Sequence, residues 1–160
     1  GHAAVGNLNL LENSLITDPK KRFQMKMGFI DFSELNEYTN EIIEKFNVKT
    51  TGVSALASSL SGGNLQKFVV GREIGQKPSL FIVNQPTWGV DALSAANIRQ
   101  AIVDIANTGA AIILISQDLD EILEISNKVA FLTNGNLSIP TNTMDIKTDE
   151  IGAIMGGISD

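Results

Sequence analysis

One short stretch limits the folds open to this chain more than any other. Residues 60–67 read Leu-Ser-Gly-Gly-Asn-Leu-Gln-Lys, follow a small polar run and open an apolar helical pattern. Ser61 is suited to cap that helix, and Gly62 and Gly63 lack a Cβ atom, so the backbone can approach a neighbour closely. A hydroxyl, bare amides and the positive end of a helix dipole together suit a phosphate group. The same residues also suit a flexible turn with an N-cap, so the rest of the chain has to separate the two interpretations.

Short apolar runs alternate with helical patterns in the second half. The run at 80–83 is too short for a helix and lies between Pro78 and Pro86, which predicts a buried parallel strand. Further runs predict strands at 110–115 and 128–132, and Asn134 with Gly135 predicts a tight hairpin turn before a return strand at 136–139. Helices are predicted at 94–107, 119–126 and 149–155, the last capped by Thr148. This alternation indicates an α/β layered core.

The first half is predicted to be helical. Apolar spacing predicts helices over 7–16 and from an Asp31 N-cap to about residue 46, with a loop or extended segment between them at 23–32. A third helix is predicted over 62–76, closed by Gly75 and Pro78. We therefore expect a helical subdomain at 7–76 and an α/β core at 77–160.

Composition excludes several classes of function. The net charge is −6 and the longest basic run is Lys20-Lys21-Arg22, so a nucleic-acid partner is not expected. The chain has no cysteine, and no apolar stretch approaches the length of a membrane span. Its single histidine, His2, stands in a Gly-His start typical of a cloning remnant, so no catalytic histidine is expected.

The order of these motifs resembles the ATP-binding cassette family. The stretch 60–67 is similar to its signature motif, 80–85 to its Walker B strand, Gly89-Val90-Asp91 to its D-loop and 116–118 to its H-loop. The resemblance is nearest to the second nucleotide-binding half of ATP-binding subunits of importers for simple sugars and nucleosides. It implies a partial P-loop NTPase-like core of parallel strands with helices, plus a helical signature subdomain. It also implies membrane-spanning permease partners and a peripheral place on the cytoplasmic face of the membrane.

Departures from the family pattern change the expected chemistry. A Gly-x-x-x-x-Gly-Lys-Ser/Thr loop is absent, and family order places it upstream of residue 1, so a C-terminal fragment is expected. Asn84 and Gln85 stand where the family has Asp-Glu, and Gln117 replaces its histidine. Asn84 is a poor Mg²⁺ ligand and Gln85 cannot accept a proton from water, so we expect a hydrolytically silent site with no metal bound. Without that context Asn84 and Gln85 also suit a polar strand end.

The signature itself is nearly intact. The resemblance implies that it closes over ATP and Mg²⁺ held by the opposite, N-terminal half, through Ser61, Gly62, Gly63, Asn64, Gln66 and Asp91. The fragment alone is expected to bind no nucleotide. Asp91 and Asp118 also suit helix caps. Trp88 stands where many family members have Arg, and it is expected to pack against Phe81 or Pro86.

Other functions are compatible with the same motifs. The chain is also interpretable as a non-catalytic interaction or regulatory module that keeps the cassette fold. A flavodoxin-like domain predicts no helical insertion over 7–60. A cassette protein outside transport, acting on nucleic acid, predicts basic patches that the chain lacks. The transported solute is not specified by the sequence, with nucleoside slightly preferred over simple sugar.

Overall fold

A computed structural model describes residues 3–18, 22–23 and 28–146 of the chain. Contacts divide the chain into two compact units, Gly1–Ile113 and Leu114–Asp160, and each unit is described by itself. The different division that the sequence predicts, between residues 76 and 77, stays a prediction. Among the described residues, no helix is both long and apolar enough to cross a lipid bilayer.

Four helices of the first unit begin at capping residues. Helix α1 (Leu10–Ile16) begins after Asn9, α2 (Phe32–Lys45) after Asp31, α3 (Gly62–Gly75) after Ser61, and α4 (Ala92–Asn107) after Asp91. Each cap accepts a backbone N–H from the first turn, which satisfies a donor that the helix itself leaves without an acceptor. The predicted helices 7–16, 31–46 and 62–76 are confirmed, the first with a later start. A short 3₁₀ turn, η1 (Ala57–Ser59), leads into α3.

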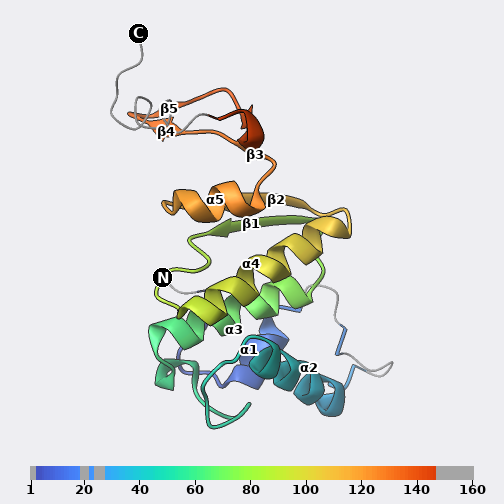
Figure 1. Cartoon of the computed structure of the whole chain (residues 1–160). Coiled ribbons are helices and arrows are strands. Elements are labelled where there is room, and N and C mark those ends of the chain that lie inside the picture. The colour runs from blue at the N-terminus through green and yellow to red at the C-terminus, as the bar shows by residue number, and fades with distance from the viewer. Residues whose placement is uncertain (1–2, 19–21, 24–27, 147–160) are drawn as a thin grey trace. The chain divides into compact units, whose positions relative to one another are not determined.

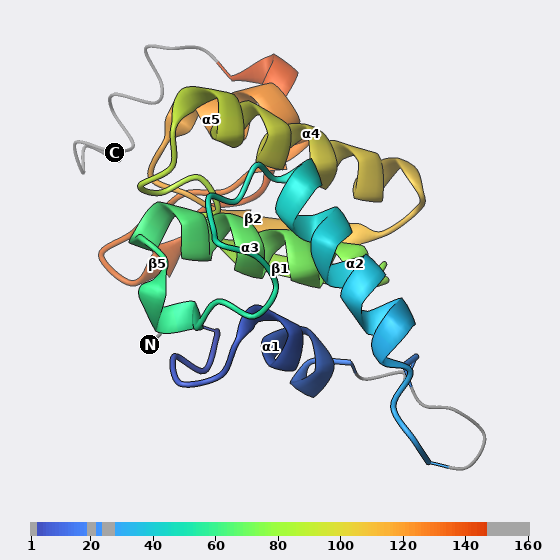
Figure 2. The same ribbon diagram turned by 90° about the horizontal axis from the view of Figure 1, so that it is seen from below.

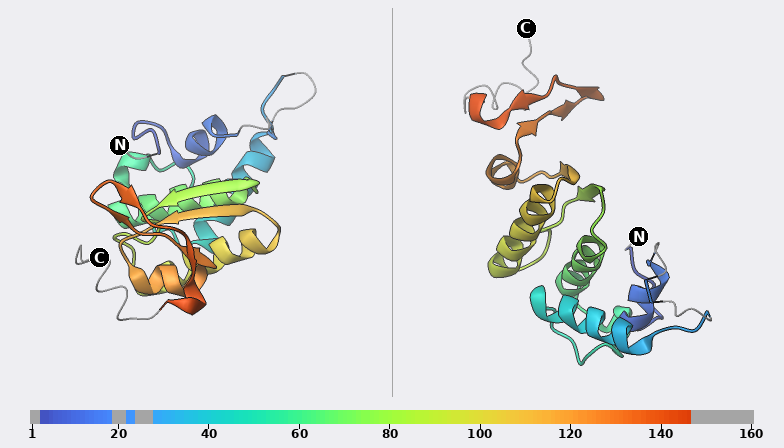
Figure 3. Two further views of the ribbon diagram at one scale, coloured as in Figure 1. Left: turned by 90° about the horizontal axis from the view of Figure 1, so that it is seen from above. Right: turned by 90° about the vertical axis from the view of Figure 1, so that its right-hand side faces the viewer.

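Two strands, β1 (Leu80–Asn84) and β2 (Ala111–Ile115), form a two-stranded sheet. They are joined by α4, and strands linked through a crossover helix run parallel (Figure 1). Helices α3 and α4 lie on the same side of the two strands (Figure 3), and α2 packs on α3 (Figure 2). The core contains apolar side chains from these elements, among them Leu35, Ile42, Phe68, Ile98 and Ile102. The predicted α/β class is confirmed.

Strand β1 is not buried on both faces as the sequence predicted. Phe81 and Val83 are buried, whereas Leu80 and Ile82 are 53% and 58% exposed. Successive side chains of a strand point to opposite faces, so among the described residues only one face of β1 is buried. An apolar run therefore alternates in exposure although its sequence does not alternate in polarity.

Gly75 also has a different role from the predicted helix stop. It is the last residue of α3. The first residue after the helix with a left-handed backbone conformation is Lys77, with φ 50°. A Cβ atom on Gly75 would lie 2.7 Å from the hydroxyl oxygen of Tyr38. That hydroxyl donates to the carbonyl of Arg72, so the glycine lets α2 and α3 approach closely.

The second unit contains helix α5 and two small antiparallel pairs. Its elements are α5 (Leu119–Ile125), β3 (Lys128–Val129), β4 (Leu132–Thr133), β5 (Asn136–Leu137), β6 (Thr141–Asn142) and a 3₁₀ turn, η2 (Thr143–Asp145). Strand β3 pairs with β6 and β4 pairs with β5. The predicted strand 128–132 is divided in two, and the hairpin turn is confirmed by positive φ values at Asn134 and Gly135. The predicted helix 149–155 and its Thr148 cap lie outside the described residues.

Candidate functional site

The N-terminus of α3 is exposed to solvent. Ser61 and Gly62 are both exposed, and Ser61 has an extended backbone before the 14-residue helix. Its hydroxyl oxygen accepts weakly from the backbone N–H of Asn64, at 3.5 Å, and from the Asn64 side-chain amide, at 2.9 Å. Among the described residues, the N–H groups of Gly62 and Gly63 have no hydrogen-bond acceptor. This helix end is therefore open to an anionic group.

The two glycines face different surroundings. A Cβ atom on Gly62 would meet nothing within 4 Å, whereas one on Gly63 would lie 2.4 Å from the carbonyl oxygen of Gly89. Gly62 thus leaves open the space in front of the helix. Gly63 instead allows the first turn of α3 to contact the loop that follows β1.

Asn64 and Gln66 both form contacts within this chain. The Asn64 side-chain oxygen accepts from the backbone N–H of Lys49 at 2.9 Å. The Gln66 amide donates to the carbonyls of Gln85 and Pro86, at 3.2 and 3.3 Å. These two side chains hold the loops on either side of the α3 N-terminus in place.

Asp91 is held by hydrogen bonds inside the fold. It accepts from the backbone N–H and the hydroxyl of Ser94, at 3.0 and 2.8 Å, and from the ammonium of Lys67, at 3.1 Å. These bonds, the two from Ser94 foremost, hold the pKa of the Asp91 carboxyl well below its usual range. The alternative role as a helix cap is confirmed for Asp91 and also for Asp118, which caps α5.

Lys67 was missed by sequence reasoning. Its side chain is 4% exposed and ion-pairs with Asp91, which is 56% exposed. The buried residues Lys67, Val70, Gly71 and Ile74 recur at the spacing of one helix face. The available signal was a lysine in register with the apolar residues of that stripe.

A shallow pocket of about 240 Å³ lies in front of the α3 N-terminus. Its lining consists of Lys49, Ser61, Gly63, Asn64, Lys67, Gly89, Val90 and Asp91. It therefore contains four of the six residues that the resemblance assigned to nucleotide. Two ammonium groups and one carboxylate give this lining a formal charge of +1, which favours an anion over a cation.

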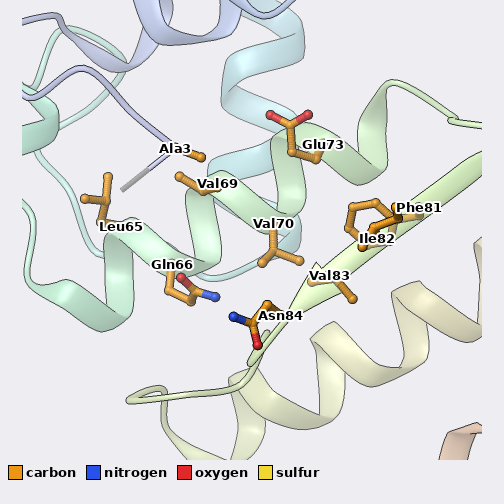
Figure 4. Close-up of a pocket in the computed structure, with 10 residues that line it drawn as sticks. All are labelled: Ala3, Leu65, Gln66, Val69, Val70, Glu73, Phe81, Ile82, Val83 and Asn84. Carbon is orange, nitrogen blue, oxygen red and sulfur yellow. The ribbon is translucent and has the colours of Figure 1, made fainter. Parts of the chain in front are cut away.

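A larger cavity of about 360 Å³ lies between α3 and β1 (Figure 4). Its walls are mainly apolar, and the Gln66 and Asn84 side chains point toward each other from the helix and the strand end. Gln85, the next residue, has φ 51°. Amides at 84 and 85 offer no anionic oxygen, and no cluster of three or more His, Cys, Asp or Glu capable of holding a metal is present in the described part of the chain.

Two further residues singled out by the sequence are exposed. Gln117 follows β2 in the second unit, directly before the Asp118 cap. Trp88 lies in the loop after β1 and is 73% exposed, which leaves little of its surface for the expected packing on Phe81 or Pro86. The turn holds its backbone, because the Trp88 N–H donates to the carbonyl of Gln85. An exposed indole in this loop was not predictable from the sequence.

Comparison with known proteins agrees with this geometry, although no family model matches the chain. The chain is 35% identical over 150 residues to the nucleoside import ATP-binding protein NupA of Lactococcus lactis, covering 94% of the chain and 30% of that protein. It is also 35% identical to the glucose import ATP-binding protein TsgD13 of Haloferax volcanii, covering 99% of the chain and 29% of the relative.

Solved structures show the same fold. The dimeric, post-hydrolysis ATP-binding cassette MJ0796 bound to ADP and Pi has a TM-score of 0.73 at 20% identity, over 88% of this chain and 59% of the cassette. The chain is therefore similar to ATP-binding cassette proteins in both sequence and fold. An inward-facing structure of a putative metal-chelate type ABC transporter has a TM-score of 0.69 at 16% identity, over 94% of this chain and 59% of that chain. The chain spans about 30% of the length of the curated relatives that it matches.

Proposed function

We propose that this chain is the part of a nucleoside or simple-sugar import ATP-binding protein that presents its signature motif to a nucleotide held by the other half. The observation that carries the proposal is the exposed, serine-capped end of α3, which opens on a small pocket of net positive charge. Relatives at 30–35% identity are import ATP-binding proteins for nucleosides, glucose and guanosine, which supports this choice of solute class.

The residues in front of α3 fit a phosphate group. Gly62 leaves the approach open, the Ser61 hydroxyl lies at its edge, and the Asp91 carboxylate is offset by Lys67 at 3.1 Å. ATP and Mg²⁺ supply the phosphate and its charge compensation when they are bound by the N-terminal half. Ser61, Gly62 and the α3 amides then orient that phosphate and exclude water from one side of it.

The chain's own Walker B position is proposed to be silent. Asn84 and Gln85 carry no charge, so neither holds a divalent cation strongly nor removes a proton from water. Gln117 offers an amide in place of an imidazole. The proposed partners are the N-terminal nucleotide-binding half and permease subunits, at the cytoplasmic face of the membrane.

ATP hydrolysis by the longer import protein tests this asymmetry. Ser61→Arg places a bulky cation at the exposed end of α3 and is expected to abolish turnover, whereas Gln85→Ala is expected to leave it nearly unchanged. Ser33→Arg is the matched control, since Ser33 is an exposed serine in the first turn of α2. Equal losses for the Ser61 and Gln85 variants would contradict the asymmetry, and full activity of both would favour a non-catalytic regulatory module.

A further inference from the structure

Lys67 connects three segments of the first unit. Its ammonium donates to the backbone carbonyl of Asn47 and to the carboxylate of Asp91, both at 3.1 Å. Asn47 follows α2, Lys67 lies in α3, and Asp91 caps α4. The lysine is 3% exposed, and a buried cation is retained only where such partners compensate its lost hydration.

The loop ahead of Asp91 is held at two points. Gly63 allows α3 to contact the carbonyl of Gly89, and Lys67 binds the carboxylate of Asp91 two residues later. Asn47 has φ 49°, and its carbonyl is directed to the same ammonium. Lys67 thus joins α3 to the pocket-lining residue Asp91 and to Asn47, which lies two residues before the lining residue Lys49.

We propose that Lys67 is a positioning residue, which fixes the spacing between the exposed end of α3 and the loop 89–91. Its ammonium acts through Asp91 and Asn47 and does not have to touch a ligand. The consequence of this positioning for ATP hydrolysis rests on the proposed function. The effect of Lys67 on the loop 89–91 is independent of that function and is measurable in this chain alone.

Trp88 reports on the loop directly, because it is the single tryptophan of the chain. Lys67→Met keeps an unbranched side chain and removes the charge, and it is expected to increase the fast, nanosecond component of the Trp88 fluorescence anisotropy decay. Lys45→Met is the matched control, since Lys45 is exposed at the end of α2. If Lys67→Met fails to fold, Asp91→Asn keeps a good cap and removes the same ion pair. A folded variant with the decay of the control would overturn the proposal.

Kinetics of the longer import protein test the consequence. We expect Lys67→Met to lower kcat roughly 10–100-fold with little change in KM, because it disturbs orientation and leaves the nucleotide-holding loop intact. Asp91→Asn should add little to Lys67→Met if the two residues act as a pair. If the losses of kcat in the two single variants add up in the double variant, the positioning role is overturned and the proposed function stands. The same holds if Lys67→Met is fully active while Ser61→Arg is inactive. An active Ser61→Arg would instead refute the proposed function.

Discussion

Alanine substitutions at the two adjacent glycines separate a packing role from a site role. In the first turn of α3, an added Cβ at Gly62 enters open space. At Gly63 it would lie 2.4 Å from the Gly89 carbonyl oxygen. Real Cβ atoms essentially never come closer than 3.0 Å to another heavy atom, so this contact is 0.6 Å too short. Because that oxygen belongs to the backbone, no side-chain rotation relieves the overlap.

The expected free-energy difference follows from this geometry. Gly62→Ala should be neutral or stabilise the chain by about 0.4–1 kcal/mol, through the lower conformational entropy of the unfolded state. Gly63→Ala shares that gain but forces a backbone shift, and overpacking of this kind costs about 1–3 kcal/mol. Since both variants make the same chemical change in the same helical turn, their difference isolates the overlap with Gly89.

Urea unfolding measures this difference, followed by far-ultraviolet circular dichroism and by Trp88 fluorescence. Gly63→Ala is expected to unfold at lower urea than Gly62→Ala, with an unchanged slope. In the longer import protein the order should reverse for activity, because a methyl group on Gly62 occupies the approach to the helix end. Equal stabilities within about 0.5 kcal/mol, the usual range for a neutral surface change, would refute the reasoning.

Three further predictions address other parts of the molecule. Arg72→Met should destabilise the chain by about 1–3 kcal/mol for each backbone carbonyl left without its donor, as measured by urea unfolding, because Arg72 is 1% exposed and donates to two of them. Asn84→Asp with Gln85→Glu should not double the ATP turnover of the longer protein; a second fast site would refute the proposed silence. The depressed pKa of Asp91 implies stability that is present above the ordinary carboxyl pKa of about 3.9 and is lost as pH falls through the lower folded value. The stability deficit of Asp91→Asn should therefore be full near neutral pH and shrink in acid, and a deficit independent of pH would count against this.

Local features of the fold were predictable because the groups that make them are close in sequence. Each cap bonds a backbone N–H two or three residues away, so Asp31, Ser61 and Asp91 could be assigned without tertiary information. The hairpin at Asn134 and Gly135 was likewise set by the left-handed conformations that these residues tolerate. The ordered motifs that indicated a cassette were also readable from the chain.

The exposure of strand β1 was not predictable from its sequence. An unbroken apolar run predicted that β1 is covered on both faces, yet Leu80 and Ile82 are exposed in the described structure. The sequence of a strand indicates which of its side chains are apolar enough to be buried. Whether each face is covered depends on other elements of the fold. Trp88 is a similar case, since the same residue suits a buried contact or an exposed one.

The sequence by itself determined the order of helices α1 to α5 and of strands β1 and β2, the caps at Asp31, Ser61 and Asp91, and the glycine-rich helix end. Only the tertiary structure decided that Gly63 serves a contact with Gly89 and that Lys67 is buried against Asp91. Those contacts join segments 24 or more residues apart, and their energies depend on distance and burial that no local pattern encodes.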